Sequence, residues 1–140
     1  MTFEDCLKQG LVKKDESVVN LVGVSMRKAQ RFLSAVELNS PGAQFDMCVI
    51  ASYNSIFSCN KALLYSKGFV EHSHVCLVES VRELFKGNLE LVSMLNAVDD
   101  LRLTRHRIQY SGIDADFEMS EFVSVLAKDY FELVKKLLGL

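Results

Sequence analysis

The sequence predicts an all-α protein, an up-and-down helical bundle of about five main helices plus a short N-terminal helix. Only one proline and seven glycines occur in 140 residues, which leaves few positions for turns. Apolar residues recur at three- and four-residue spacing through most of the chain, as on the buried face of a helix. With 49% hydrophobic residues, the chain has enough apolar surface for one helical domain over residues 1–140.

The first three helices are expected over residues 2–10, from about 15 to 38, and from about 40 to 67. Gly10 ends the first, and Asp15 or Ser17 caps the second. Ser40 and Pro41 begin the third, because proline in a first helical turn lacks only an N–H that would be unpaired anyway.

Three more helices are expected over residues 73–85, from about 89 to 110, and from about 118 or 120 to the C-terminus. Gly68 ends the preceding helix in the left-handed conformation, and Ser73 caps the next one. Gly87 and Asn88 then separate two helices, and Ser120 or Glu118 starts the last.

Small side chains form a second stripe on the third helix, beside its apolar one: Cys48, Ser52, Ser55, Cys59 and Ala62. Such a stripe allows another backbone to approach closely. Two interpretations follow, packing against the second or fifth helix of the same chain, or the contact of a homodimer.

The composition excludes several classes of protein. The net charge is −2, so no global positive field attracts nucleic acid, and any nucleic-acid contact has to be local. No apolar run reaches the ~20 residues of a membrane span. The four cysteines lack CxxC or zinc spacing and are interpreted as small buried residues in a reducing compartment, which predicts a cytoplasmic protein without a metal or other cofactor.

Arg105 is the most informative residue. It continues a stripe with helical spacing on the fifth helix, formed by Leu91, Met94, Leu95, Val98, Leu101 and Ile108. A charge on a buried stripe is costly unless it is paired or opens onto a cleft. Arg102, His106 and Arg107 make this stretch the densest basic cluster, although Arg102 and Arg107 also suit a solvated C-terminal helix end.

Candidate partners of Arg105 lie on the third helix. Tyr53 and Asn60 are seven residues apart on its apolar stripe, and a buried tyrosine or asparagine needs a hydrogen-bond partner. We therefore count Arg105, Tyr53, Asn60 and the adjacent Lys61 as candidate ligand-binding residues, since a guanidinium suits phosphate. Asp46 offers the competing interpretation, a plain buried ion pair with Arg105.

The three histidines receive structural interpretations. His72 and His74 flank the expected cap Ser73 and are assigned to that turn rather than to a metal site. His106 lies about 100° around the helix from Arg105 and is expected to be exposed.

Several blocks of the chain resemble the HEPN domain family, particularly its small stand-alone prokaryotic members. The blocks are residues 3–8, 52–57, 62–68, 73–77 and 82–85, and Arg105 followed after four residues by Tyr110. The resemblance implies a helical bundle, usually a homodimer, with the arginine motif near the dimer cleft. It also implies either a toxin–antitoxin pair with a small nucleotidyltransferase or a metal-independent endoribonuclease.

The motif departs from that of the ribonuclease members, in which a histidine follows the arginine after four to six residues. Tyr110 takes that position here, and His106 follows Arg105 directly. A phenol with an ordinary pKa near 10 is a poor general base at neutral pH. Arg105 and Tyr110 are nevertheless the candidate catalytic residues.

Three functions remain open from the sequence. The first is a module that binds a nucleotide or RNA phosphate at Arg105, or docks a nucleotidyltransferase partner. The second is an endoribonuclease that uses Arg105 and Tyr110, and the third is an interaction scaffold in which Arg105 forms a core ion pair. No membrane contact is expected in any of them.

Overall fold

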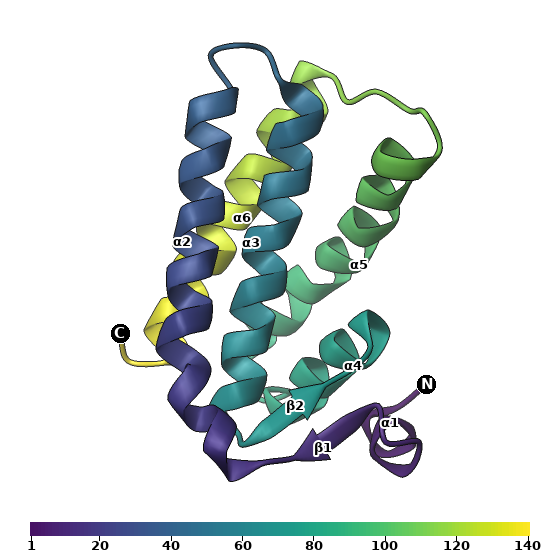
Figure 1. Cartoon of the computed structure of the whole chain (residues 1–140), viewed down its shortest axis with the longest axis vertical. Coiled ribbons are helices and arrows are strands. Elements are labelled where there is room, and N and C mark those ends of the chain that lie inside the picture. The colour runs from purple at the N-terminus through teal and green to yellow at the C-terminus, as the bar shows by residue number, and fades with distance from the viewer.

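The computed structural model describes all 140 residues and confirms the all-α bundle (Figure 1). Its helices are α1 (Phe3–Lys8), α2 (Val22–Asn39), α3 (Phe45–Ser66), α4 (His74–Leu84), α5 (Leu89–Tyr110) and α6 (Phe117–Leu137). A 3-10 helix, η1 (Glu16–Leu21), precedes α2, and the strands β1 (Val12–Lys14) and β2 (Phe69–Glu71) pair with each other.

Helix α3 lies at the centre of the bundle (Figure 1). It packs against α2 and α6 along its length, and against α4 and α5 on the remaining side. Its mostly apolar sequence reflects this position, because a helix with neighbours all around must be hydrophobic all around. The core therefore surrounds α3, and side chains of α3 can reach every other long helix.

The small-residue stripe of α3 packs against α2 within the same chain. Ser55 Oγ donates to the backbone oxygen of Ala29 at 2.9 Å, and Cys48 Sγ lies 3.7 Å from that of Val36. Contacts to backbone atoms require the close approach that small side chains permit. Cys48 and Ser55 of the stripe therefore contact α2 of the same chain, as the first of the two interpretations predicted.

Helix boundaries differ from expectation at three starts. Helix α2 begins at Val22 instead of near residue 15, because the segment capped by Asp15 forms the 3-10 helix η1. Helix α3 begins at Phe45 instead of near Pro41, because residues 40–43 form a turn in which Ala43 has a φ of 56°. Helix α6 begins at Phe117, where the Asp116 side chain accepts a hydrogen bond from the Met119 backbone nitrogen. The predicted cap at Ser73 is confirmed, since its hydroxyl accepts from the Cys76 backbone nitrogen.

The two-stranded antiparallel sheet was not predicted. Val12 pairs with Glu71 and Lys14 with Phe69, so the segment after α1 lies against the segment that joins α3 to α4. Gly68 makes this connection with a φ of +79°, the left-handed conformation expected for a helix stop. An added Cβ at Gly68 would meet the Glu16 carboxylate at 2.9 Å.

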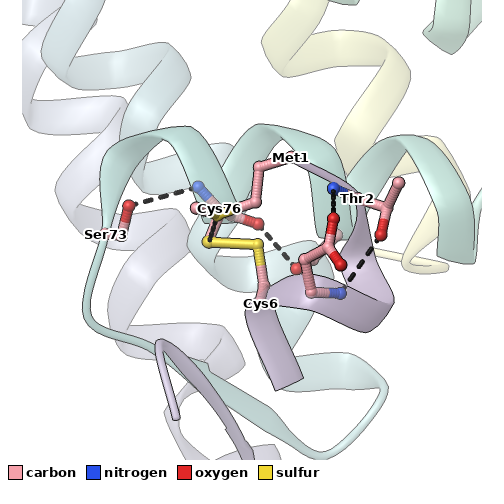
Figure 2. Close-up of a disulfide and its surroundings, with 7 residues drawn as sticks. Met1, Thr2, Cys6, Ser73 and Cys76 are labelled. Carbon is pink, nitrogen blue, oxygen red and sulfur yellow. Dashed lines mark hydrogen bonds between the residues drawn. A yellow bond between two sulfur atoms is a disulfide. The ribbon is translucent and has the colours of Figure 1, made fainter. Parts of the chain in front are cut away.

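The interpretation of all four cysteines as free buried residues was wrong for two of them. Cys6 of α1 and Cys76 of α4 form a disulfide, shown in Figure 2, which ties the N-terminal segment to the bundle. Cys48 and Cys59 are free and buried. The two cysteines are 70 residues apart in sequence, so no local spacing could have indicated the bond. The cysteine pattern therefore no longer argues for a reducing compartment.

None of the helices combines the length and the apolar character needed to cross a membrane.

Candidate functional site

Arg105 extends from α5 toward α3. The neighbouring stripe residues Leu101 and Ile108 are buried as expected, whereas Arg105 itself is half-buried. Its guanidinium carbon lies 4.5 Å from the centre of the Tyr53 ring, a cation–π contact between α5 and α3. The structure thus brings together two of the candidate ligand-binding residues.

The Arg105 guanidinium has no carboxylate within ion-pair distance. One terminal nitrogen donates to Gln109 Oε1 at 2.8 Å on the same helix, while its Nε is buried without a hydrogen-bond partner. Asp46 instead accepts a hydrogen bond from the Ala115 backbone nitrogen at 2.6 Å. The alternative of a core ion pair between Asp46 and Arg105 is therefore wrong.

A histidine that the sequence analysis assigned to a turn belongs to this cluster. His74 follows the cap Ser73, and its Nδ1 lies 2.8 Å from Tyr53 Oη. Its ring also stacks on Phe57, with centres 4.5 Å apart. The contact depends on the packing of α3 against α4, which joins residues 21 apart in sequence. No spacing within either helix could have indicated it.

The Tyr53–His74 hydrogen bond has two protonic forms. Either the phenol donates to the Nδ1 lone pair, or Nδ1–H donates to the phenol oxygen, depending on the tautomer. In the second form, Nε2 carries the free lone pair and His74 can accept a proton. The phenol then retains its own proton for donation to a ligand.

Burial and charge favour the neutral forms of both groups. Burial raises the pKa of Tyr53 above its usual 10.0, against the opposing effect of Arg105. The pKa of His74 falls below 6.5 because one ring face loses water, and because Arg105 repels a second positive charge. His74 is exposed overall, but its packed face lies against Phe57. At neutral pH the pair is an uncharged phenol beside an uncharged imidazole.

A second arginine shares the inner side of α5. Arg102 precedes Arg105 by three residues, a spacing that places both on neighbouring positions of one helix face, and its Nε is likewise buried without a partner. The neighbouring Asp99 does not pair with Arg102, because it accepts a hydrogen bond from Arg82 of α4 at 3.0 Å. Two arginines without ion-pair partners therefore act on the Tyr53–His74 pair, since the charge of each lowers the pKa of both groups.

The remaining candidate residues lie elsewhere. Asn60 is buried in the core, where its Oδ1 accepts a hydrogen bond from the Tyr130 hydroxyl. Lys61 pairs with Glu71 at 3.4 Å. Tyr110 is 68% exposed and contacts His106, with ring centres 4.9 Å apart. None of the three joins the contacts of Arg105.

No group of three or more His, Cys, Asp or Glu side chains is close enough to hold a metal ion. What the cluster offers instead is positive charge, a phenol and an imidazole beside the ring of Phe57. Those groups bind anions, and phosphate in particular, through charge-assisted hydrogen bonds.

Comparison with known protein families matches residues 22–137 to the HEPN domain. The chain belongs to the HEPN domain family. The matched range contains Tyr53, His74 and Arg105, so the whole cluster lies inside the HEPN domain, whereas α1, β1 and η1 precede it. Neither curated proteins nor solved structures gave a match. Membership of the HEPN family associates the domain with nucleotides or RNA.

Proposed function

We propose that this HEPN protein binds the phosphate of a nucleotide or of RNA at Arg105. The supporting observation is the state of that guanidinium, which is half-buried without a carboxylate and has an Nε without a partner. A buried donor of this kind costs about 1–3 kcal/mol when it stays unpaired. Phosphate oxygens can accept two parallel hydrogen bonds from a guanidinium, which would satisfy the donor and neutralise the charge.

The surroundings of Arg105 favour an anion over a neutral ligand. Arg102 adds a second positive charge, and Asp99, three residues before it on α5, is already paired with Arg82. Tyr53 stays protonated at neutral pH and can donate a further hydrogen bond to a phosphate oxygen. Phe57 lies beside the pair and offers a ring on which a base can stack.

Calorimetry with uridine monophosphate and with single-stranded RNA tests this proposal. Arg105→Ala should weaken binding at least about tenfold, since charge-assisted hydrogen bonds contribute ~1.5–3 kcal/mol each. Arg107→Ala removes one arginine from the exposed side of the same helix and should bind as wild type. Equal affinity of Arg105→Ala and wild type, with unchanged helical circular dichroism, would contradict the proposal.

We also propose that the protein works as a homodimer and as one half of a toxin–antitoxin-type pair with a nucleotidyltransferase. Membership of the HEPN family supports this role. So do the large apolar side chains exposed around the start of α6, where Phe117 and Phe122 are 58% and 67% exposed. Light scattering should give the mass of a dimer, and a nucleotidyltransferase should be encoded beside this gene and copurify when coexpressed. A monomer that captures no such enzyme would contradict this role.

A second candidate function is a metal-independent endoribonuclease, and the position of His74 favours it. His74 Nε2 would take the proton of a ribose 2′-hydroxyl, whose oxygen attacks phosphorus while the 5′-oxygen leaves and is protonated by water. Arg105 would stabilise the charge on the phosphorus-bound oxygens, a role whose loss typically costs ~100-fold. In this arrangement His74, rather than Tyr110, is the base.

Incubation of RNA with the protein in excess chelator tests for cleavage. His74→Asn and Arg105→Ala should each abolish cleavage. Tyr110→Phe should leave it unchanged, because Tyr110 is exposed and its ring lies against His106. Intact RNA with the wild-type protein would exclude the nuclease and leave the binding function in place.

A further inference from the structure

A groove between α2 and α3 has no role in the function proposed so far. Its volume is about 780 Å³, and it adjoins the face of α3 that carries Phe57. Cations and aromatic rings are prominent in its wall: Lys28, Arg31, Lys61, Phe32, Phe57 and Tyr65. No carboxylate lines it. A groove with this lining suits an anionic ligand that also carries flat rings.

Two of these cations are unpaired. Lys28 and Arg31 are exposed on α2, three residues apart, and neither takes part in an ion pair. Lys61, in contrast, is engaged with Glu71 at 3.4 Å. The positive charge available to a ligand in the groove therefore comes from α2, opposite the rings of α3.

The groove is continuous with the Arg105 cluster through Phe57. This ring lines the groove, stacks on His74 at 4.5 Å and lies 5.6 Å from Lys61 Nζ. Tyr53, Phe57, Lys61 and Tyr65 follow one another at intervals of four residues along α3, about 6 Å of helix rise each. A ligand that begins at Arg105 can thus continue along α3 past Phe57 into the groove.

We infer that the ligand of this protein is single-stranded RNA that occupies both places, which deepens the proposed function and rests on it. One phosphate binds at Arg105, the adjoining base stacks on Phe57, and the next phosphates contact Lys28 and Arg31. Single-strand binding sites combine these two elements, aromatic rings for the bases and cations along the backbone. A mononucleotide reaches only the first place, whereas an oligonucleotide spans both.

The test compares uridine monophosphate with single-stranded hexauridylate. Wild type should bind the hexanucleotide on the order of tenfold more tightly or better, because stacking and further phosphate contacts add to the first site. The double variant Lys28→Gln/Arg31→Gln should lose most of this advantage and keep the affinity for the mononucleotide. Phe32→Ala, which removes only a ring of the groove, should weaken the hexanucleotide alone.

The control removes the same charge elsewhere. Lys8 and Lys86 are exposed and do not line the groove. Lys8→Gln/Lys86→Gln should therefore bind both ligands as wild type, and circular dichroism should show equal helix content in all variants.

Failure of this inference is distinguishable from failure of the proposed function. If the Lys28/Arg31 variant binds hexauridylate as wild type does, while Arg105→Ala still weakens the mononucleotide, the groove does not bind RNA and the phosphate site stands. If that variant instead converts a dimer into a monomer at unchanged hexauridylate affinity, a second copy covers the groove and the inference is overturned. If Arg105→Ala binds the mononucleotide as wild type does, the proposed function itself falls.

Discussion

Arg105 is held by an aromatic ring instead of a carboxylate. A cation–π contact with Tyr53 contributes about 1 kcal/mol at a partly exposed position and does not neutralise the charge. The ring therefore orients the guanidinium and leaves its charge available. An ion pair at the same position would have neutralised the charge and blocked the site.

The pKa of His74 should depend on the charge of Arg105. We expect NMR titration to give His74 a pKa below 6.5, because its face against Phe57 is shielded from water and because Arg105 is near. Arg105→Ala should raise this pKa toward 6.5, while Arg107→Ala should not change it. A His74 pKa that does not respond to Arg105→Ala would contradict the geometry of the cluster.

The sign of the linked stability effect follows from the direction of the shift. Folding lowers the pKa of His74, so the unfolded chain binds the proton more readily than the folded one. This contribution to stability is complete above pH 6.5 and is lost as the pH falls toward the lowered value. Because His74 is exposed, the loss should be small, and ligand binding is the better readout.

Substitutions of two tyrosines should distinguish effects on stability from effects on ligand binding. Tyr130 is fully buried, and its hydroxyl donates to Asn60, so Tyr130→Phe leaves a buried amide oxygen unpaired. Urea unfolding should show a loss of about 1–3 kcal/mol with nucleotide affinity unchanged. Tyr53→Phe should do the reverse and weaken binding with little loss of stability. If Tyr130→Phe weakened binding as well, Asn60 would belong to the site after all.

At the scale of elements, the long helices were predictable and the short segments were not. Helix α5 has its expected bounds because Asn88 caps its start, Gly112 follows its end, and apolar residues at helical spacing lie between them. The strands β1 and β2 span three residues each, too few for any period to show. Pro41 is compatible both with the first turn of a helix and with the turn in which it lies, so the sequence could not distinguish the two.

The candidate site was predictable only where one helix carried the signal. Arg105 stood out because it interrupts the apolar stripe of α5, and Tyr53 because it lies on that of α3. His74 could not be found, since its contact with Tyr53 depends on how α3 and α4 pack. Asn60 was misleading for the same reason. Its position on a buried stripe indicates that Asn60 has a hydrogen-bond partner. That this partner is Tyr130 follows only from the packing of α3 against α6.

The disulfide should stabilise the attachment of α1 to α4. Closing a loop of 70 residues restricts the unfolded chain, and loss of such a bond typically costs ~2–5 kcal/mol. We expect the melting temperature of the oxidised protein to fall on reduction, and mass spectrometry to find the Cys6 and Cys76 peptides linked. The double variant Cys6→Ser/Cys76→Ser should melt near the reduced protein and be insensitive to reductant. Equal melting of oxidised and reduced wild type would contradict the role of this bond.

For the molecule as a whole, the charges are distributed so that only local positions attract RNA. The net charge of −2 gives no overall pull on RNA, while Arg102, Arg105, Lys28 and Arg31 are free of ion pairs. Helix α3 connects the two pairs, because its residues line both the Arg105 cluster and the groove. Binding should therefore depend on a few phosphates instead of on a broad basic surface.

The salt dependence of the affinity measures the number of phosphate contacts directly. Each phosphate neutralised on a single strand contributes about −0.7 to the slope of log affinity against log salt concentration. Contacts by these four cations predict a slope of about −2 to −3 for hexauridylate, measured by fluorescence anisotropy across a potassium chloride series. Lys28→Gln/Arg31→Gln should make the slope shallower by about 1.4, because two of those contacts are gone. A slope near zero would rule out phosphate contacts, and one steeper than about −5 would require a basic surface that this chain, at its net charge, does not carry.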